Sequence, residues 1–334
     1  MIEVERLEKR FVRWEKRGRV RRARREVRAV DDVTFSVERG TLCGYIGPNG
    51  AGKSTTVKML TGILVPSSGR ISVGGLEPSR QRIKLARRIG AMFGQRVQLW
   101  WDLPLLDSFE LLRHVYRVPG DRYRANLATF RELLDLDPFL QTPVRQLSLG
   151  QRVRGELSAV MLHDPEIVFL DEPTIGLDVV AKERVREFLT EINRERGVTV
   201  MLTTHDLTDI ERLCKRILMI DHGRLIYDGT VDDLLARYGG ERTLVVDLEQ
   251  PAPPLDVPGA RVTRVDGARQ WLRFRRDETT AAAVTAAVAQ RAQLVDLALE
   301  EPDIEEVVRR IYTGSDRDAP GVENAAMHAP RPPS

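Results

Sequence analysis

The stretch "GPNGAGKST", residues 47–55, decides the fold. It fits the pattern G-x-x-x-x-G-K-[S/T]. A short apolar run, "TLCGYI" at 41–46, comes before it, and a segment of helical periodicity follows. A strand, a glycine-rich loop and a helix in this order let successive backbone N–H groups converge on phosphate oxygens. The sequence therefore predicts a phosphate-binding loop at the end of a buried strand.

All nine residues of this loop are candidate nucleotide contacts: Gly47, Pro48, Asn49, Gly50, Ala51, Gly52, Lys53, Ser54 and Thr55. The ammonium group of Lys53 would neutralise the β and γ phosphates, which makes it a candidate catalytic group as well. The Ser54 hydroxyl is an oxygen ligand of the kind that Mg²⁺ prefers. A nucleoside triphosphate with Mg²⁺ is therefore the predicted ligand.

Two adjacent carboxylates follow an apolar strand in "IVFLDEP", residues 167–173. Neighbouring residues of a strand point to opposite faces, so we expect Asp171 and Glu172 to have different roles. We assign Asp171 to Mg²⁺, through water, and Glu172 to the water that attacks the phosphate. The alternative is a structural pair that caps the end of the strand.

Two other polar residues follow predicted strands. His205 comes after "VTVMLTT" (198–204), and Gln95 comes after "RIGAMFG" (88–94). Ligands of open parallel sheets bind at the carboxyl ends of the strands, so we expect His205 to contact the γ-phosphate. The amide of Gln95 would contact the metal or the attacking water. A lone histidine that only packs in the core is the alternative for His205.

A second glycine-hinged turn, "LSLGQR" at 147–152, opens another predicted helix. Ser148, Gly150 and Gln151 offer a hydroxyl, an unobstructed backbone and an amide, which suit an anion at a helix N-terminus. The loop at 47–55 would already hold the phosphates of the nucleotide bound by this chain. The residues alone therefore do not explain why the chain carries this second turn.

Alternating strands and helices from 40 to 230 predict a largely parallel sheet with helices on both faces. Helical patterns without strands interrupt this rhythm at 96–163. From 241 to 312, four strand patterns and two helical ones predict a small α+β domain. We therefore expect a first domain at 1–238, this second domain at 241–312 and a disordered tail at 313–334.

The composition is typical of a globular protein, with 42% hydrophobic and 30% charged residues among 334. No apolar run approaches the roughly 18 to 20 residues of a membrane span, and the N-terminus lacks a secretory pattern. A cytoplasmic location is expected. Cys43 and Cys214 fall in predicted core segments, so we expect both to be buried packing residues rather than a disulfide.

The net charge of +3 conceals a basic segment, "KRGRVRRARREVR" at 16–28, where eight residues are Lys or Arg and one is Glu. A solvated or partly disordered insertion would have this composition. Contact with the anionic inner leaflet of a membrane is a second interpretation. A nucleic acid partner is not expected, because no aromatic residues alternate with the charges.

Together, "GPNGAGKST", Gln95, "LSLGQR", "IVFLDEP", "GLD" (176–178) and His205 resemble, in this order, the ATP-binding subunit of an ABC transporter. The resemblance covers about residues 3–237. It implies an α/β P-loop NTPase fold of the ABC ATPase type with an inserted helical subdomain, and ATP and Mg²⁺ as cofactors. The stretches around "GQRVQLWWDLPLLDSFELL" and "DEPTIGLDVVAKERVREFL" resemble the ABC-2 type exporters in particular.

The resemblance also implies partners. In similar proteins two such domains pair head to tail, so the turn at Ser148 would contact the nucleotide held by a second copy or by a paralogous subunit. Asp178 would couple the two sites. Membrane-spanning permease subunits would dock on the protein at the inner face of the membrane. Trp100 and Trp101 are candidates for that docking surface, with core packing as the alternative.

The adenine ring would stack on an aromatic residue near the N-terminus. Phe11 resembles the family's residue by position, Trp14 competes with it, and core packing is the alternative. The chain departs from the commonest family pattern at Leu149, where Gly is usual, and at Ile175, where Ser is usual. The side chain of Leu149 must therefore point away from the nucleotide.

Two rival functions remain at this point. One is a soluble ABC-type ATPase of translation, DNA repair or chromosome organisation, although the chain lacks the second cassette, zinc modules or long coiled coils of such relatives. The other is a regulatory nucleotide-binding module without turnover.

Overall fold

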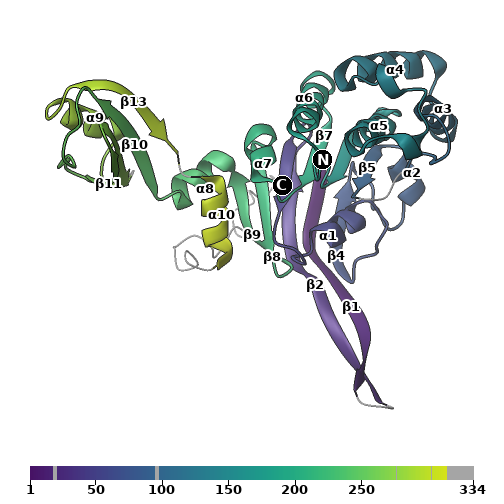
Figure 1. Cartoon of the computed structure of the whole chain (residues 1–334). Helices are drawn as coiled ribbons and strands as arrows, with labels where there is room; N and C mark the ends of the chain where they lie inside the picture. The colour runs from purple at the N-terminus through teal and green to yellow at the C-terminus, as the bar shows by residue number, and fades with distance from the viewer. Residues whose placement is uncertain (18–20, 95–97, 276, 302, 314–334) are drawn as a thin grey trace, which may run out of the picture. The chain divides into compact units, whose positions relative to one another are not determined.

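A computed structural model of the chain describes residues 1–17, 21–94, 98–275, 277–301 and 303–313 (Figure 1). The described residues form two compact units. One is Met1–Gly229, and the other begins at Thr230. The first unit contains two sheets and the second contains one, and each unit has its own hydrophobic core.

A six-stranded sheet forms the centre of the first unit, in the order β5-β6-β7-β3-β8-β9. Its strands are β3 (Leu42–Ile46), β5 (Ile89–Phe93), β6 (Ile167–Asp171), β7 (Thr199–Thr203), β8 (Arg216–Asp221) and β9 (Arg224–Thr230). The four neighbouring pairs β5–β6, β6–β7, β7–β3 and β3–β8 are parallel. The prediction of a largely parallel sheet is confirmed, and the carboxyl ends of its five parallel strands point toward one edge.

A second, antiparallel sheet has the order β2-β1-β4, with β1 (Ile2–Arg17), β2 (Arg21–Val37) and β4 (Ser68–Val73). Helix α1 (Lys53–Leu60) and apolar residues of both sheets form a single core, which includes Phe35 of β2 and Tyr45 of β3, with ring centroids 5.9 Å apart. Burying each such aromatic side chain contributes roughly 1.5–3 kcal/mol. This core places the loop at 47–55 between the two sheets.

The basic segment at 16–28 belongs to the hairpin of β1 and β2. Backbone pairing continues to Arg17 opposite Arg21, and residues 18–20 lie outside the described part. Figure 1 shows the two strands running together along the described part of the hairpin. The described residues of the segment are thus strands, and the interpretation of a disordered insertion does not hold for them.

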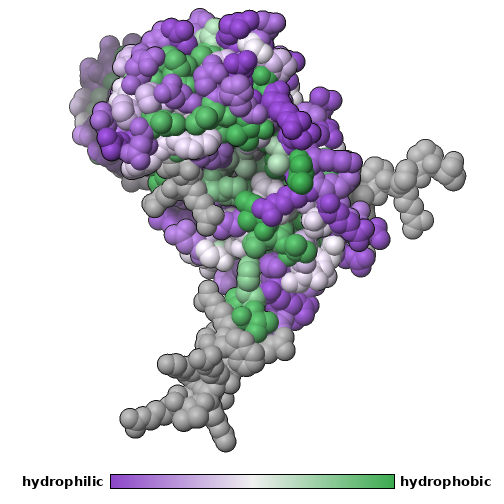
Figure 2. All heavy atoms as spheres, turned by 90° about the vertical axis from the view of Figure 1, so that its right-hand side faces the viewer, coloured by the Kyte–Doolittle hydropathy of each residue, from purple (hydrophilic) through white to green (hydrophobic). Residues whose placement is uncertain are grey.

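Helices α3 (Leu105–Tyr116), α4 (Gly120–Leu134) and α5 (Leu149–Met161) form the predicted helical insertion. No strand occurs in the described part of the chain between β5 and β6. The insertion packs on α6 (Val179–Arg196), where the rings of Phe130 and Phe188 meet edge to face at 5.8 Å. Figure 2 shows the side of the molecule that lies on the right in Figure 1, and apolar patches lie there among polar ones.

Two short helices complete the first unit: α2 (Arg82–Ala86) and α7 (Leu207–Leu213). Cys43 on β3 and Cys214 after α7 are both buried and free, as predicted. Burial raises the pKa of the Cys43 thiol to about 12. Within the described residues, no helix combines the length and the hydropathy that a membrane span requires.

The second unit contains α8 (Val231–Tyr238), β10 (Glu241–Leu248), β11 (Ala260–Asp266), β12 (Arg269–Arg275), α9 (Ala281–Ala289), β13 (Leu294–Glu300) and α10 (Ile304–Thr313). Its antiparallel sheet has the order β11-β12-β10-β13. The predicted four strands and two helices from 241 onward are confirmed. The exact domain limits stay a prediction, and residues 314–334 of the predicted tail lie outside the described part.

Candidate active site

The loop at 47–55 connects the end of β3 to the start of α1 and fits tightly between neighbouring backbones. Gly52, at φ +112°, lies so close to β2 that a Cβ atom there would be 2.4 Å from the carbonyl oxygen of Ala29. A Cβ atom on Gly47 would be equally close to the carbonyl oxygen of Ile220 on β8. Only glycine fits either position, so the loop's backbone N–H groups have a fixed arrangement.

Lys53 starts α1 and lies inside this loop. Its side chain is buried, and Nζ donates to the carbonyl oxygens of Gly47 at 2.5 Å and of Pro48 at 3.3 Å. Burial lowers the pKa of Lys53, and the negative charges of Glu172 and Asp171 oppose this change. The ammonium group is therefore held at the centre of the loop with two carboxylates nearby.

Ser54 and Asp171 bring a hydroxyl and a carboxylate together from α1 and β6. The Ser54 hydroxyl donates to Oδ2 of Asp171 at 3.2 Å, and Thr203 at the end of β7 donates to Oδ1 at 2.5 Å. Two hard oxygen groups beside a phosphate loop fit Mg²⁺, which keeps several waters and shares its remaining positions with substrate phosphates. Among the described residues there is no cluster of three or more His, Cys, Asp or Glu that suits a metal held by side chains alone.

Glu172 and His205 form a second pair at the same edge of the sheet. Nδ1 of His205 lies 2.7 Å from Oε2 of Glu172, and the imidazole is 61% exposed. The reason given for separate roles of the two carboxylates was wrong, because β6 ends at Asp171 and Glu172 has a left-handed backbone, at φ +56°. This turn, rather than strand alternation, directs the two carboxylates to different partners.

The turn at 148–151 forms a capping box at the start of α5. The hydroxyl oxygen of Ser148 accepts from the N–H of Gln151 at 3.2 Å, and Oε1 of Gln151 accepts from the N–H of Ser148 at 2.9 Å. A hydroxyl that accepts one bond still has its own proton to donate. The serine can therefore cap its helix and donate to a phosphate oxygen at the same time.

Leu149 lies against the loop that precedes α6. A Cβ atom on Gly176 would be 2.9 Å from Cδ2 of Leu149, so this leucine is accommodated by a neighbouring glycine at φ +72°. Asp178 ends that loop and caps α6 by accepting from the N–H of Ala181 at 2.8 Å. Leu149, where the chain departs from the commonest family pattern, therefore packs directly against the loop that contains the "GLD" motif at 176–178.

The remaining predicted residues differ in what the structure shows of them. Phe11 is half-buried, with Nζ of Lys9 5.3 Å from its ring centre, so it is not a fully buried core residue, and its stacking on adenine stays a prediction. Trp100 and Trp101 are 39% and 48% exposed, which excludes core packing for them too. Gln95 and the side chain of Trp14 lie outside the described residues.

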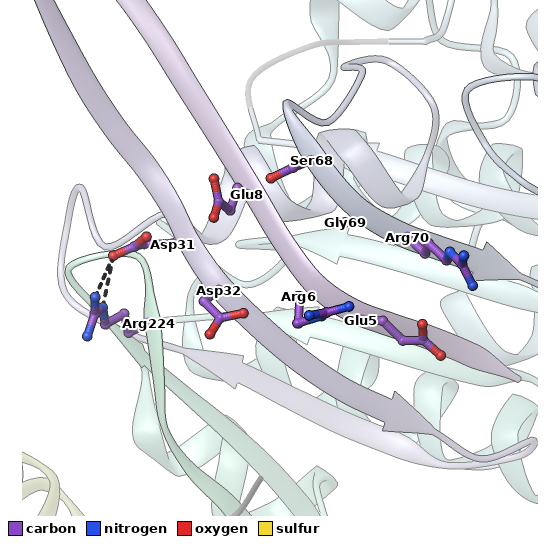
Figure 3. A pocket seen from close by; sticks show the side chains of 9 residues that line it. All are labelled: Glu5, Arg6, Glu8, Asp31, Asp32, Ser68, Gly69, Arg70 and Arg224. Carbon is purple, nitrogen blue, oxygen red and sulfur yellow. Dashed lines mark hydrogen bonds and ion pairs between the residues drawn. The ribbon is translucent and has the colours of Figure 1, made fainter.

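A separate pocket of about 700 Å³ lies beside the β1–β2 hairpin, shown in Figure 3. It contains none of the predicted site residues. Its lining includes the carboxylates of Glu5, Glu8, Asp31 and Asp32, and Asp31 pairs with Arg224 at 2.8 Å. The lining also includes the guanidinium groups of Arg6, Arg70 and Arg224, but the carboxylates outnumber them, so the loop at 47–55 remains the candidate nucleotide site.

The strand ends thus combine a cationic phosphate loop, a hydroxyl–carboxylate pair and a carboxylate–imidazole pair. These groups suit hydrolysis of a phosphoanhydride, which requires charge neutralisation and an oriented water molecule. Sequence reasoning missed Thr203, although a threonine at the end of the strand next to β6 was visible as "MLTT". It also missed Glu156, a buried carboxylate on α5.

Comparison with known proteins agrees with this chemistry. The family described as ABC transporter matches residues 30–175. The chain is 36% identical to the daunorubicin resistance ATP-binding protein DrrA3 of Streptomyces coeruleorubidus, over 87% of this chain and 92% of that protein.

Two solved structures share the fold. One is an ATP-binding subunit of an ABC transporter, with a TM-score of 0.61 and 27% identity, covering 71% of this chain and 93% of that one. The other is a dimeric bacterial ABC transporter cassette, with a TM-score of 0.59 and 25% identity, covering 69% of this chain and 99% of that one.

The chain therefore belongs to the ATP-binding proteins of ABC transporters. It is an ATP-binding and ATP-hydrolysing subunit of such a transporter, and the predicted P-loop NTPase fold is confirmed. The rival of a regulatory module without turnover is thereby excluded.

Proposed function

We propose that two nucleotide-binding domains, either two copies of this chain or this chain and a paralogue, pair head to tail and drive export through separate membrane-spanning subunits. The full-length similarity to a drug-resistance ATP-binding protein supports export and a membrane-peripheral location at the inner face. The chemistry of the site carries the proposal, because it contains both halves of a composite ATP site.

In this proposal the loop at 47–55 and Lys53 hold the β and γ phosphates, and the Phe11 ring stacks on adenine. The capping box at Ser148 and Gln151 presents its free hydroxyl proton and the N–H of Gly150 to the γ-phosphate of the partner's nucleotide. Asp178, which caps α6 beside the contact of Leu149 with Gly176, connects that turn to the strand end that carries Glu172.

Hydrolysis then depends on the carboxylates. A water oxygen attacks the γ phosphorus, the bond to the β–γ bridging oxygen breaks, and the water's proton passes to Oε of Glu172. His205, held by Glu172 through Nδ1, has its Nε2 available for a γ-phosphate oxygen. Ser54 and Asp171, with Gln95, would hold Mg²⁺, which supplies neutralisation of the charge on the phosphates.

A charge-neutral substitution tests this role of Glu172. Glu172→Gln keeps the shape of the side chain but cannot accept the proton, so we expect ATP to bind while turnover falls by about 10² or more. The variant should accumulate as an ATP-dependent dimer in analytical ultracentrifugation. Wild-type phosphate release by this variant would remove Glu172 from the mechanism.

The membrane partner is tested by isolation. We expect protein tagged at the C-terminus and extracted from native membranes in mild detergent to bring a multi-spanning protein at near-equal ratio, identified by mass spectrometry. Ribosomes or DNA-bound factors in its place would contradict the proposed membrane partner. They would support a soluble ABC-type ATPase of translation, DNA repair or chromosome organisation.

A further inference from the structure

Helix α5 carries a buried carboxylate that the hydrolysis of ATP does not use. Glu156 lies eight residues after Ser148 and is only 4% exposed. Its carboxylate accepts from the backbone N–H of Gln98 at 2.9 and 3.1 Å and from that of Leu99 at 3.5 Å. A buried carboxylate requires such partners, because it has lost its hydration.

The two N–H groups belong to a segment that connects the active site to the exposed tryptophans. Gln98 comes three residues after Gln95, and the next residues after Leu99 are Trp100 and Trp101. The backbone N–H of Trp100 in turn donates to the Ser108 hydroxyl of α3 at 3.2 Å. Glu156 therefore holds the segment at the point where it enters the helical insertion.

Two other residues of α5 contact the same segment. The guanidinium of Arg152 lies over the ring of Trp101, 5.8 Å from its centre. A Cβ atom on Gly155 would be 2.8 Å from Leu105 of α3 and 3.3 Å from Leu99, so this glycine allows both α3 and the segment to approach the helix closely. Positions 152, 155 and 156 share one face of a helix, which thus forms a continuous contact with residues 98–101.

The residues just before α5 hold the other side of the segment. The N–H of Arg145 donates to the carbonyl oxygen of Trp101 at 3.0 Å, and its guanidinium pairs with Asp102 at 3.0 Å. Val144 donates its N–H to the carbonyl oxygen of Leu103 at the same distance. Residues 98–103 are therefore attached to the chain on both sides of the turn at Ser148.

We propose that Glu156 is a positioning residue that ties residues 98–101 to α5, so that the turn at Ser148 and the tryptophan pair move as one piece when the partner's nucleotide is engaged. This rests on the proposed function, in which that turn contacts ATP across a dimer. Glu156 would act through Gln98 and Leu99 and would not touch the nucleotide.

The tie makes a specific demand on side-chain chemistry. Position 156 needs a hydrogen-bond acceptor, not only a side chain of the right volume. Gln retains one acceptor oxygen at nearly the same place, whereas Leu fills the space and leaves both N–H groups without a partner. Glu156→Gln and Glu156→Leu therefore form a matched pair.

Trp101 itself can report the movement. In the full-length chain with Trp14, Trp100 and Trp271 changed to Phe, the fluorescence of Trp101 is quenched by acrylamide with and without Mg²⁺ and ATP, and ATP affinity is measured separately with a fluorescent ATP analogue. With Glu156 present, we expect ATP to change the quenching constant about twofold. Glu156→Gln should keep most of this change, and Glu156→Leu should lose more than half of it while ATP affinity stays within about threefold.

A full response in the leucine variant would overturn the role of Glu156 alone. No response in the reporter with Glu156, despite normal ATP binding, would overturn both this inference and the proposed transmission to the tryptophan surface. If the leucine variant does not fold, Arg152→Ala replaces it, because it removes the ring contact with Trp101 from the surface of the helix. The ATP-dependent change in the quenching constant of Trp101 should then decrease as well. An unchanged value would reject the proposal that the turn at Ser148 and the tryptophan pair move together.

Discussion

At the scale of single residues, the active site depends on a backbone turn between two carboxylates. Glu172 has a left-handed conformation, which costs a residue with a Cβ atom roughly 1–2 kcal/mol. The turn directs Glu172 to His205, while Asp171 stays on the strand and contacts Ser54 and Thr203. The strain is therefore located between the group that we propose for the attacking water and the group that we propose for the metal.

The titration of Glu156 gives a prediction about stability. Burial raises its pKa from an ordinary value of 4.5 to about 7, against the opposing effect of the N–H groups of Gln98 and Leu99. A raised pKa in the folded state means that this carboxyl stabilises the fold below pH 4.5 and that the contribution disappears as the pH rises through 7. The stability of the wild type relative to Glu156→Gln should therefore fall by roughly 2 kcal/mol between pH 5.5 and 8.

Urea denaturation of both proteins at these two pH values measures the difference. The glutamine variant serves as the reference for the wild type, because the two proteins share all other titrating groups. A difference that does not depend on pH would show that Glu156 has an ordinary pKa.

At the scale of elements, a buried ion pair holds α6 against α7. Asp209 is fully buried and accepts from Nε of Arg186 at 2.7 Å, while the Arg186 side chain is only 10% exposed. Among the described residues, Asp209→Ala would leave the buried guanidinium of Arg186 with only Glu183, at 3.2 Å, as a carboxylate partner, and would remove the acceptor of the Thr174 hydroxyl. We therefore expect a loss of about 3–5 kcal/mol in the free energy of unfolding.

An exposed pair on the same helix provides the control. Glu191 pairs with Arg194 at 2.7 Å, but these side chains are 34% and 66% exposed. Glu191→Ala should therefore cost less than about 1 kcal/mol. Equal losses in the two variants, measured by urea denaturation, would contradict the claim that burial determines the strength of the α6–α7 contact.

The elements also show what the sequence predicts well. Strands β3, β6 and β7 are continuous apolar runs that end in the motif residues, so strands and site residues were predictable together. The β1–β2 hairpin was not predicted, because its basic half at 16–28 lacks alternating apolar residues and its pairing is set by backbone and distant contacts. The capping box was predictable from S-x-x-Q at 148–151, because this spacing lets each side chain accept from the other residue's backbone N–H.

At the scale of the whole molecule, the contacts that connect sites join residues distant in sequence. Glu156 meets Gln98 and Leu99 across more than fifty residues, and Leu149 meets Gly176 across the insertion's boundary with the sheet. Neither contact follows from periodicity or motif spacing, because both depend on how the insertion packs on the sheet. A single sequence therefore identified the candidate catalytic groups but not the contacts that connect them.

The exposed tryptophans give the prediction that tests the protein within its complex. Aromatic residues dominate the energetics of interfaces, and Trp101 is held in place by Arg152 and by the backbone of Arg145. If the membrane subunit docks on this residue, Trp101→Ala should weaken the complex by about 2 kcal/mol, or roughly thirtyfold in Kd. The affinity for ATP should not change, because none of the candidate ATP-binding groups in the described part of the chain contacts the indole ring.

The matched control is Ile83→Ala, which removes an apolar side chain that is 77% exposed on α2. Both variants are purified with the membrane partner, and the partner recovered per ATPase subunit is compared with ATP affinity and with the partner's stimulation of ATP hydrolysis. We expect Trp101→Ala to lose partner and stimulation together, and Ile83→Ala to keep both. Full recovery and stimulation with Trp101→Ala would place the docking surface elsewhere, and the tie through Glu156 would then end at a surface that no permease contacts.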